Sequence, residues 1–547
     1  MDIWNRKIIL YGGKKIQEDF KYLYQNLDIN DDVPVEEMDY IIDNSKDCLI
    51  VVCEKKADLG FEKVAQEKGL RYKREYCYIT DLFAYYNPIF LERRERKLAV
   101  WGTGTAAEEL WDTLDRAGIA SEIDFFIDNS RDKTLFKEKE VLAPENIQDR
   151  ENVYIIVATY VYQWEIYKQL EKYGFQAQKD YIHCTEAGRN YCEMLEKVCF
   201  AEKQYSYYCN RPLGYCDVIT GDLYLCCPDY LPVSVGSMQS ESFMSCWDSY
   251  TARILRLSVL NGTFVFCNKA YCDLFDFERE DEKELKPCLN YEGSYSEYPN
   301  TLMVGIDYSC NLRCPSCRNK VSVAGADERG EMLRQAEDLL EHVIPYVGRL
   351  WLAGSGEVFF SKVYRKIWND ERCQKRESIS ILTNGTLFDR ENWELLEESY
   401  QTIEVVVSMD GIKNETIEKL RRGADAKALK KNLEFLGKLR KENRIRKLFL
   451  SCVLQADNVA ELYELLEYCR GIGVDKVQFL KLKDNGVYEE EEQFKAVSVF
   501  DHNDCLKKEF SHYFTNELLM HPLADWFNSS RALQVEKKPR LDKYDTL

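Results

Sequence analysis

The feature that most limits how this 547-residue chain can fold is a regular alternation of apolar and amphipathic segments between residues 300 and 485. Six short apolar runs are each followed by a charged stretch with helical periodicity. Parallel strands need such helical crossovers, whereas antiparallel hairpins do not. The alternation therefore predicts an α/β fold, and at this length a partial (β/α)6 barrel of the TIM type. The six runs are LMVGID, RLWLAGSG, ISILTNG, IEVVVSMD, KLFLSCVL and KVQFLKL.

The N-terminal part contains a second α/β pattern, present twice. Residues 6–11 form an apolar run before Gly12-Gly13, and residues 96–101 form one before Gly102-Thr103-Gly104. In each copy a later run ends in Asp-Asn and a further apolar run follows. This order predicts two Rossmann-like, doubly wound units. We expect a degenerate Rossmann-like unit at 1–94, a second at 95–190, a cysteine-rich domain at 195–295, the barrel at 298–485 and a C-terminal extension at 486–547.

The second copy has the stronger binding signature. Gly102, Gly104 and Ala107 fit a G-x-G-x-x-G/A turn, which brings a helix N-terminus against a phosphate. Asp128 ends the next strand, where its carboxylate could accept a hydrogen bond from a ribose hydroxyl. The copy resembles nucleotide-sugar-type Rossmann-like domains of some surface-polysaccharide proteins. The alternative is an empty structural unit, which we expect for the first copy because it lacks the G-x-G turn.

Charge and hydropathy exclude several classes of protein. Lys plus Arg is 74 and Asp plus Glu is 94, a net charge of −20. This argues against a general binder of nucleic acid or anionic membranes. No apolar run of about 18 residues is present, and Met1-Asp2-Ile3-Trp4-Asn5 lacks the order of a signal peptide. We expect a cytoplasmic protein without a membrane span.

Cysteine is the unusual residue type, with 21 cysteines against 5 histidines. Disulfide scaffolds are small and secreted, and this chain is large. Of the 21 cysteines, 14 lie between Cys184 and Cys317. Clustered thiols in a cytosolic protein indicate metal, and so few histidines favour thiolate-only sites such as iron–sulfur clusters.

One motif, Cys310-Asn-Leu-Arg-Cys314-Pro-Ser-Cys317, follows the first barrel run. Three thiolates at this spacing can hold three irons of a [4Fe–4S] cluster and leave the fourth iron open. The alternative is a zinc site with a fourth ligand elsewhere. The motif resembles that of the radical S-adenosylmethionine (SAM) superfamily. This resemblance implies that SAM chelates the open iron and is cleaved reductively to a 5′-deoxyadenosyl radical, which takes a hydrogen atom from a substrate.

Further segments match the superfamily in order along the chain. Glu357 follows a glycine-rich turn where the family has Gly-Gly-Glu-Pro, and the resemblance makes it an acceptor for the SAM ammonium group. Ser408 and Arg421 are assigned to the ribose and carboxylate, and Leu480 to a strand near the adenine. Ser316 and Val358 replace an aromatic residue and a proline of the family pattern. The full set assigned to SAM is Gly354, Ser355, Gly356, Glu357, Asn384, Ser408, Arg421 and Leu480.

The cysteine-rich segment, which shows little regular periodicity, resembles a SPASM-type auxiliary cluster domain. The resemblance rests on a cysteine, a glycine-containing hairpin, a Cys-Cys pair, a helix with Trp247 and a closing C-x4-C pair. It implies at least one auxiliary iron–sulfur cluster, although the domain precedes the barrel here. The implied ligands are Cys209, one of Cys226 and Cys227, Cys267 and Cys272. A zinc ribbon-like site is the alternative. We interpret Cys216, Cys246 and Cys288 as extra ligands or buried thiols, and Cys48, Cys53, Cys77, Cys373, Cys452, Cys469 and Cys505 as packing residues.

The expected function is therefore that of a radical SAM enzyme. The Rossmann-like pair favours a nucleotide-linked sugar or another cell-surface precursor as substrate. The first alternative is maturation of a ribosomal peptide or of a partner protein. The second is a non-catalytic regulatory protein that binds the clusters and SAM, motivated by Ser316 and Val358. Besides a small-molecule or peptide substrate, we expect an electron donor such as flavodoxin or ferredoxin.

Overall fold

The chain divides into two compact units in a computed structural model. The N-terminal unit comprises residues 1–213, 233–267 and 280–295, and the barrel unit comprises residues 214–232, 268–279 and 296–547. No described helix has the length and apolar character that a membrane-spanning segment needs. The structure describes residues 6–24, 29–30, 48–54, 60–85, 93, 95–116, 119–130, 132–147, 150–159, 162–177, 179–189, 191–205, 209–269, 272–275, 295–352, 356–484, 487–488, 490–526, 529 and 533.

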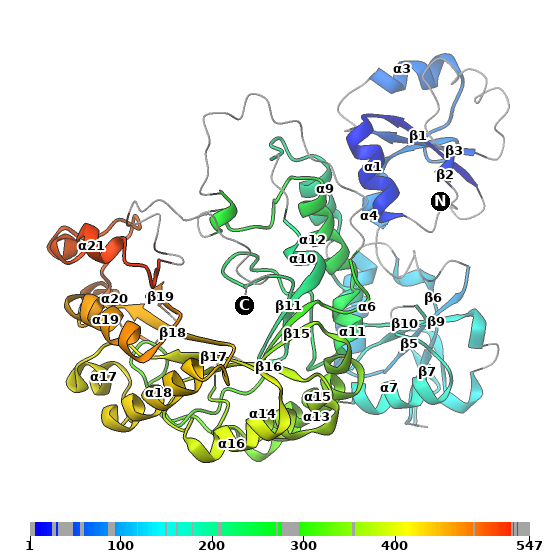
Figure 1. Cartoon of the computed structure of the whole chain (residues 1–547). Helices are drawn as coiled ribbons and strands as arrows, with labels where there is room; N and C mark the ends of the chain where they lie inside the picture. The colour runs from blue at the N-terminus through cyan, green and yellow to red at the C-terminus, as the bar shows by residue number, and fades with distance from the viewer. Residues whose placement is uncertain are drawn as a thin grey trace. The chain divides into compact units, whose positions relative to one another are not determined.

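The barrel unit is built on one sheet whose strands run parallel except at one edge (Figure 1). The six apolar runs of the sequence form six consecutive parallel strands, which confirms the predicted α/β fold with a partial barrel. In spatial order the strands are β12 (Asp222–Tyr224), β11 (Tyr215–Ile219), β14 (Thr301–Gly305), β15 (Arg349–Leu352), β16 (Ser378–Thr383), β17 (Thr402–Ser408), β18 (Lys447–Leu454), β19 (Lys476–Lys481) and β20 (Ala524–Asp525).

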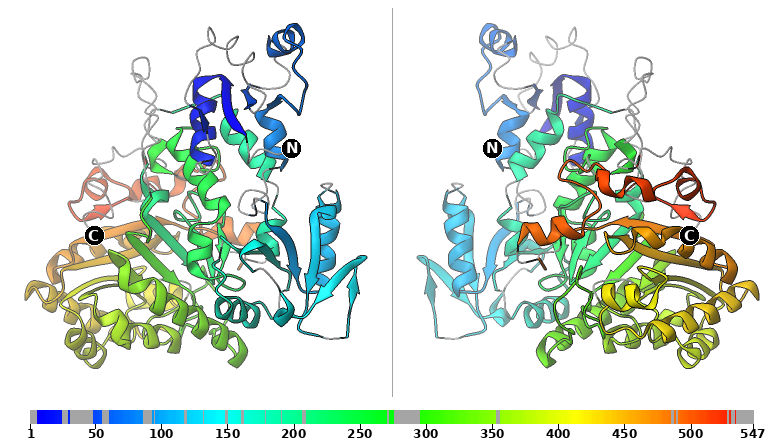
Figure 2. Two further views of the ribbon diagram at one scale, coloured as in Figure 1. Left: turned by 90° about the vertical axis from the view of Figure 1, so that its right-hand side faces the viewer. Right: turned by 90° about the vertical axis from the view of Figure 1, so that its left-hand side faces the viewer.

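Helices cover the outer face of this sheet (Figures 1 and 2). Each helix between two strands of the barrel buries an apolar stripe against the sheet, as a parallel crossover requires. The helices are α13 (Ala326–His342), α14 (Lys362–Asn369), α15 (Glu371–Gln374), α16 (Arg390–Ser399), α17 (Asn414–Leu420), α18 (Ala426–Lys441) and α19 (Leu462–Ile472), followed by α20 (Glu491–Val497) and α21 (Asn516–Leu519).

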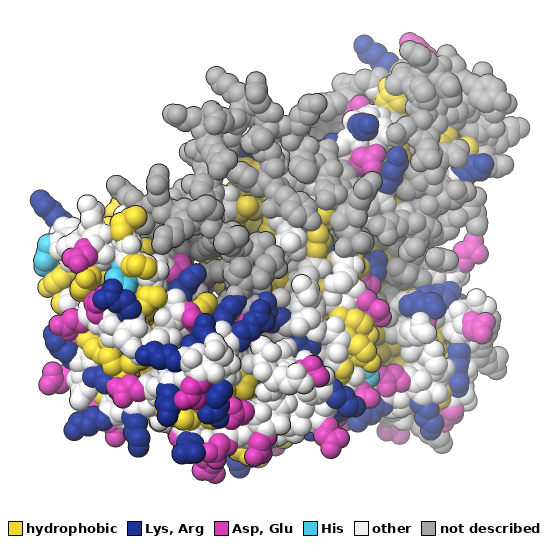
Figure 3. Space-filling view, in the orientation of Figure 1, with side chains coloured by type: hydrophobic (Ala, Val, Ile, Leu, Met, Phe, Trp, Pro, Cys, Tyr) yellow, Lys and Arg dark blue, Asp and Glu magenta, His cyan; other side chains and the backbone are white. Residues whose placement is uncertain are grey.

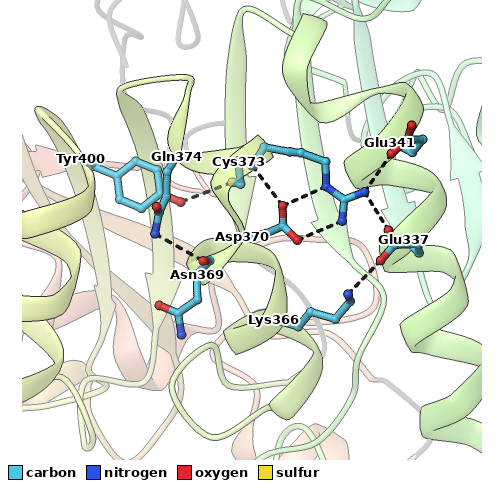
Figure 4. A network of polar contacts seen from close by, with 9 residues as sticks. Glu337, Glu341, Lys366, Asn369, Asp370, Cys373, Gln374 and Tyr400 are labelled. Carbon is cyan, nitrogen blue, oxygen red and sulfur yellow. Dashed lines mark hydrogen bonds and ion pairs between the residues drawn. The ribbon is translucent and has the colours of Figure 1, made fainter.

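A polar network joins three of these helices on the outside of the barrel (Figure 4). Arg372 pairs at 2.9 Å with Asp370, the residue that precedes its helix, and at 2.7 Å with Glu337 on α13. Cys373 points into the packed layer, where its thiol accepts a hydrogen bond from the Tyr400 hydroxyl at 3.3 Å. Cys373 is thus a buried residue among the outer helices, consistent with a packing role.

The strand β11 lies within residues 195–295, the segment whose sequence shows little regular periodicity. It pairs in parallel with β14, with Asp217 opposite Met303, and so extends the barrel sheet by one strand before the first predicted one. Cys216 and Val218 are fully buried on one face of this strand. The run YCDVI is short and carries a central aspartate, so its periodicity does not reveal a barrel strand.

The N-terminal unit contains two further sheets. One has the order β2 (Ile29–Asn30), β1 (Lys7–Gly12), β3 (Cys48–Cys53) and β4 (Tyr76–Tyr78), and all its pairs are parallel. The other has the order β10 (Tyr181–His183), β9 (Val153–Val157), β5 (Lys97–Trp101), β6 (Ile123–Ile127), β8 (Lys139–Leu142) and β7 (Leu135–Phe136). In both, the first strand lies inside the sheet with later strands on either side. Residues 40–44, the expected Asp-Asn strand of the first copy, lie outside the described residues.

The helices of this unit cover the two sheets and continue into the cysteine-rich segment. Residues of α9 and α12 belong to the same buried cluster as strands β1 and β3, so the core of the first sheet includes residues far along the chain. The helices are α1 (Lys14–Leu23), α3 (Gly60–Glu67), α4 (Ile79–Tyr85), α6 (Thr105–Arg116), α7 (Gln163–Lys172), α8 (Cys184–Ala187), α9 (Tyr191–Cys199), α11 (Phe243–Trp247) and α12 (Tyr250–Leu260). The short strand β13 (Gly236–Ser237) precedes α11, and α10 (Arg211–Gly214) ends where the barrel unit first begins.

Candidate active site

A cavity of about 520 Å³ lies within the barrel unit, between the inward-facing side chains of the sheet and the loops that follow its strands. Its base is apolar, with Trp351, Val406 and Phe449 packed together. The predicted site residues that line it are Cys227, Cys310, Cys314, Cys317, Gly356, Glu357, Asn384, Ser408, Arg421 and Leu480. The residues from Cys310 to Leu480, spread over about 170 positions of the sequence, therefore meet around one cavity, because the loops after parallel strands share one edge of a sheet.

The cysteine loop follows β14 directly and is held by backbone hydrogen bonds. The Cys310 amide donates to the Ser322 carbonyl at 2.8 Å, and the Cys317 amide donates to the Cys314 carbonyl at 2.9 Å. Cys310 is buried, Cys314 is half-buried and Cys317 is exposed. Burial raises the pKa of the Cys310 thiol, and it raises that of Cys314 to about 11. Both thiols are therefore protonated at neutral pH until a bound metal displaces the protons.

Gly356 brings the next loop into contact with the start of the cysteine loop. A Cβ atom at this position would lie 2.4 Å from the Asp307 carbonyl oxygen and 2.6 Å from that of Ser309. The neighbouring Glu357 amide donates to the same Ser309 carbonyl at 2.8 Å. Only glycine permits this approach. Gly354 and Ser355, the other two residues of this predicted turn, lie outside the described residues.

Glu357 is 1% exposed, and both of its carboxylate oxygens accept hydrogen bonds from the protein. One oxygen accepts from the Thr383 hydroxyl at 2.6 Å, and the other accepts from the Asn384 amide at 2.7 Å. Burial raises the pKa of this carboxyl group. Glu357 thus ties the turn after β15 to the end of β16, and its predicted contact with an ammonium group stays a prediction.

Asn384 connects three loops at the rim of the cavity. Its side-chain nitrogen donates to the Asn311 side-chain oxygen at 2.9 Å and lies 3.8 Å from the Cys310 sulfur. Its side-chain oxygen accepts from the Thr386 amide at 3.0 Å. The residue therefore orients the cysteine loop with bonds that are complete within the protein.

Arg421 and Asp410 form a buried ion pair beside the cysteines. The Arg421 Nη2 atom lies 3.0 Å from a carboxylate oxygen of Asp410, and the two residues are 8% and 2% exposed. The other oxygen of Asp410 accepts from the Val453 amide at 2.7 Å. The Nε of Arg421 is buried without a hydrogen-bond partner among the described residues. A buried donor of this kind fits the carboxylate of a bound amino acid group such as that of SAM. Asp410 had not been predicted as part of the site, although it stands two residues after Ser408.

The strand β11 and its hairpin add a wall that was not predicted from the sequence. Tyr215, Asp217 and Asp229 line the cavity, and Asp229 forms an ion pair with Lys483, which also lines it. Asp217 is 8% exposed. A charged residue inside the apolar run YCDVI was the only sequence signal for this wall.

The adjacent cysteines 226 and 227 have different surroundings. Cys227 lines the cavity, and its thiol lies 3.6 Å from a carboxylate oxygen of Asp229. Burial raises the pKa of Cys227 to about 12. Cys226 is 6% exposed and does not line the cavity. The structure thus distinguishes the two thiols, as the sequence could not.

The predicted auxiliary ligands are divided between the two units. Cys209 and Cys267 belong to the N-terminal unit, whereas Cys226, Cys227 and Cys272 belong to the barrel unit. Cys288 lies outside the described residues. Within the described part of the chain, no group of three or more His, Cys, Asp and Glu side chains is arranged around a single metal ion. The auxiliary ligand set stays a prediction.

The predicted phosphate turn of the second copy belongs to the N-terminal unit, and its residues have roles within the protein. Gly102 has a φ of +126°, and a Cβ atom there would lie 2.4 Å from the Ala158 carbonyl oxygen. Asp128 accepts hydrogen bonds from the Thr103 hydroxyl at 2.6 Å and from the Ser130 amide at 2.8 Å. Gly104 has no crowded neighbour. The contacts of Gly102 and Asp128 need no ligand to explain them, and the nucleotide site stays a prediction.

Residues 307–469 match the sequence profile of the Radical SAM superfamily. This chain contains a radical SAM domain. The matched range begins in the loop after β14 and includes the three cysteines, Glu357, Asn384, Ser408 and Arg421. Domains of this superfamily use a [4Fe–4S] cluster and SAM, the two cofactors that the sequence predicted. The thiol set fits the cluster, and the free Nε of Arg421 fits SAM. Residues 94–180 match a second profile, "C2185-like, N-terminal".

Among proteins of known function, the chain is similar to the antilisterial bacteriocin subtilosin biosynthesis protein AlbA of Bacillus subtilis (strain 168). The two are 28% identical over 130 residues, which is 23% of this chain and 28% of AlbA. The chain thus matches less than a third of that relative.

Two solved structures show weaker likeness. Streptococcus suis SuiB bound to precursor peptide SuiA is 19% identical with a TM-score of 0.26, over 34% of this chain and 40% of that one. The structure of anSMEcpe with bound AdoMet is 21% identical with a TM-score of 0.30, over 40% of this chain and 58% of that one.

Proposed function

We propose that the protein is a radical SAM enzyme that modifies a ribosomally made peptide or a partner protein. The observation that carries the SAM chemistry is the meeting of Cys310, Cys314 and Cys317 with the unsatisfied Nε of Arg421 around one cavity. The three thiols would supply ligands for three irons of a cluster, and the guanidinium would supply a donor for the carboxylate of bound SAM. When bound, the cluster supplies the electron that cleaves SAM to a hydrogen-abstracting radical.

The remaining residues of the site position these groups. Asp410 holds the Arg421 guanidinium through its Nη2 atom, and the Nε of Arg421 has no hydrogen-bond partner among the described residues. Glu357 and Asn384 hold the loops after β15 and β16 against the cysteine loop. Ser408 and Leu480 line the cavity where the resemblance assigns the ribose and the adenine. The apolar base excludes water from the reacting atoms.

The similarity to AlbA supports a peptide rather than a nucleotide-linked sugar as substrate. AlbA is named for the biosynthesis of a bacteriocin, which is a peptide. The preference for a nucleotide-linked sugar depended on the second Rossmann-like copy, where the contacts of Gly102 and Asp128 lie within the protein. The alternative that the sequence left open is therefore the better supported one.

We also propose that thiolates of the cysteine-rich segment hold an auxiliary iron–sulfur cluster, as the resemblance of this segment implies. Thiolate clusters need a reducing compartment, which supports a cytoplasmic location and a one-electron donor protein as partner.

The test is anaerobic reconstitution with iron and sulfide, followed by SAM, dithionite and a deuterated candidate substrate. The probes are peptides encoded beside the gene, with UDP-N-acetylglucosamine as the sugar control. We expect 5′-deoxyadenosine that carries deuterium from a peptide. Absence of 5′-deoxyadenosine under all conditions would overturn the enzyme proposal. If deuterium were transferred from the sugar and from no peptide, the substrate would be a nucleotide-linked sugar instead.

A further inference from the structure

Of the three cysteines in the predicted cluster site, Cys317 is the most exposed to solvent. Cys310 is 8% exposed and Cys314 is half-buried, whereas Cys317 is exposed. An electron that enters a cluster from another protein crosses the shortest distance where the cluster approaches the surface. The residues around Cys317 would therefore offer a short path for an electron to a cluster held by the three thiols.

Three exposed cations surround this entry. In the sequence, Arg313 lies between Cys310 and Cys314, and Lys320 lies three residues after Cys317. Arg422 lies beside Arg313, because the Arg422 carbonyl accepts a hydrogen bond from the Arg313 amide at 3.0 Å. The bond between Cys310 and Ser322 holds the Lys320 segment beside the loop. None of the three side chains lines the cavity. All three side chains are exposed.

These cations differ from most of those elsewhere on the barrel. None of Arg313, Lys320 and Arg422 has an ion-pair partner among the described residues. On the outer helices, by contrast, cations such as Arg372, Lys419 and Arg444 pair with carboxylates. Figure 3 shows the two signs of charge interspersed over the barrel helices on the face that it draws. Three unpaired cations in one place are unusual in a chain with a net charge of −20.

Two exposed apolar side chains complete the surface. Val321 is 47% exposed and Val323 is 59% exposed, and both follow Lys320 directly in the segment that borders the cysteine loop. Arg318 is directed inward, since it donates to the Tyr308 carbonyl at 2.7 Å and lines the cavity. A small apolar centre with a cationic rim is typical of a transient protein-docking surface.

We propose that Arg313, Lys320, Val321, Val323 and Arg422 form the docking surface for an acidic one-electron donor protein. The inference rests on the proposed function, because only a redox cluster at Cys310–Cys317 needs such a partner. One electron leaves the reduced donor, which is oxidised by one electron, and enters the cluster, which is reduced by one. The exposed valines and the acidic remainder of the chain favour a protein over a nucleic acid as occupant.

The experiment uses the full-length reconstituted protein and the double variant R313E/K320E. The probe is an acidic bacterial flavodoxin with its NADPH-dependent reductase. Calorimetry measures flavodoxin binding, and 5′-deoxyadenosine formation is measured with flavodoxin and separately with dithionite. We expect the Kd for flavodoxin to rise at least about tenfold and its salt dependence to fall, because rim charges steer association. The dithionite-driven rate should stay unchanged, because dithionite needs no docking.

The matched control is K375E. Lys375 is exposed, has no ion-pair partner among the described residues and precedes β16, at the opposite edge of the sheet from the cysteine loop. The K375E substitution should leave flavodoxin binding unchanged. Equal flavodoxin affinity in R313E/K320E and the intact chain would overturn the inference. The inference would also fail if R313E/K320E lost binding to a single-stranded oligonucleotide but kept its binding to flavodoxin. If dithionite yields no product with any chain, the proposed function fails, while the binding data still test the surface.

Discussion

At the scale of single residues, the site contains a buried hydrogen-bond donor that has no partner among the described residues. Glu357 and Asn384 complete their hydrogen bonds within the protein. The Nε of Arg421 does not, although the residue is only 8% exposed. A buried donor without a partner costs about 1–3 kcal/mol, so the residue is retained against stability. The ligand carboxylate is its natural acceptor.

The first prediction concerns the middle cysteine of the loop. C314A should abolish SAM cleavage, because two thiols cannot hold three irons. Iron bound by the cysteine-rich segment should remain. Iron and sulfide counts per chain, together with 5′-deoxyadenosine formation under dithionite, measure both effects.

The control for C314A is C505A, which removes an exposed thiol outside the cavity. It should retain the iron content and the activity of the intact chain. SAM cleavage by C314A at an undiminished rate would contradict the assignment of the catalytic cluster.

A second prediction concerns a buried carboxyl group in the N-terminal unit. Glu241 is 4% exposed, one of its oxygens has no hydrogen-bond partner among the described residues, and burial raises its pKa well above the ordinary value. Nearby Glu186 also has a raised pKa, and its partner is Arg189 at 3.3 Å. The folded chain keeps the Glu241 proton to a higher pH than the unfolded chain does. Stability therefore falls as pH rises above about 4.3, by up to about 1.4 kcal/mol per pH unit.

E241Q keeps the shape of the side chain without the ionisation. Its unfolding temperature should exceed that of the intact chain at pH 7.5 and approach it at pH 5. E151Q, at an exposed position of the same unit, should follow the intact chain at every pH. A pH-independent difference for E241Q would show that the carboxyl group is not the cause.

At the scale of elements, the cysteine loop is held in place mainly by the backbone of its neighbour. The turn at Gly356 packs against the Asp307 and Ser309 carbonyls, and the Cys310 amide pairs with Ser322. Neither contact involves a cysteine side chain. These contacts therefore shape the loop without using its thiols.

The third prediction tests this contact. G356A should destabilise the protein by about 1–3 kcal/mol and lower its iron content, because a methyl group would lie 2.4 Å and 2.6 Å from two backbone oxygens. Urea unfolding and iron analysis measure the two effects.

Gly330 supplies the matched control for this substitution. It lies in α13, and a Cβ atom there would meet nothing within 4 Å. G330A should gain about 0.5–1 kcal/mol, because alanine favours a helix over glycine. A G356A protein with full stability and full iron content would show that the turn does not position the loop.

At the scale of the whole molecule, one face of the first sheet shares its core with helices far along the chain. Leu195 and Val198 of α9, with Ile254 and Leu257 of α12, share one buried cluster with β1 and β3. About 250 residues separate the ends of this cluster in the sequence. Residues 1–94 therefore cover apolar surface that belongs to the cysteine-rich segment.

The fourth prediction follows from this shared core. A chain that begins at residue 95 should lose solubility, because each of those four side chains gives up about 1.5–3 kcal/mol of burial. Soluble yield and size-exclusion chromatography measure the effect. In the intact chain, L195D should reproduce the loss, whereas L135D should not, since Leu135 is 66% exposed. A soluble monomer from residue 95 onward would instead make residues 1–94 an independent domain.

The sequence was sufficient for the features that local pattern dictates. The six barrel strands follow from apolar runs separated by amphipathic helices, because a strand buried on both faces must be continuously apolar. The cysteine triad and the residues at the strand ends follow from motif spacing. The short strand β11, with Asp217 facing the cavity, could not be found in this way. Its place depends on pairing with β14, some 85 residues away, and pairing over that distance leaves no periodic mark in either segment.

The tertiary structure alone distinguished residues of the same chemical type. Cys226 and Cys227 are neighbours in sequence, yet only Cys227 lines the cavity, since successive residues can face different surroundings. Asp410 became a site residue because the fold buries it against Arg421. The surface at Arg313, Lys320 and Arg422 arises because two loops meet. Residue type and spacing therefore specify which chemistry is available, and burial and long-range contact decide which side chains take part in it.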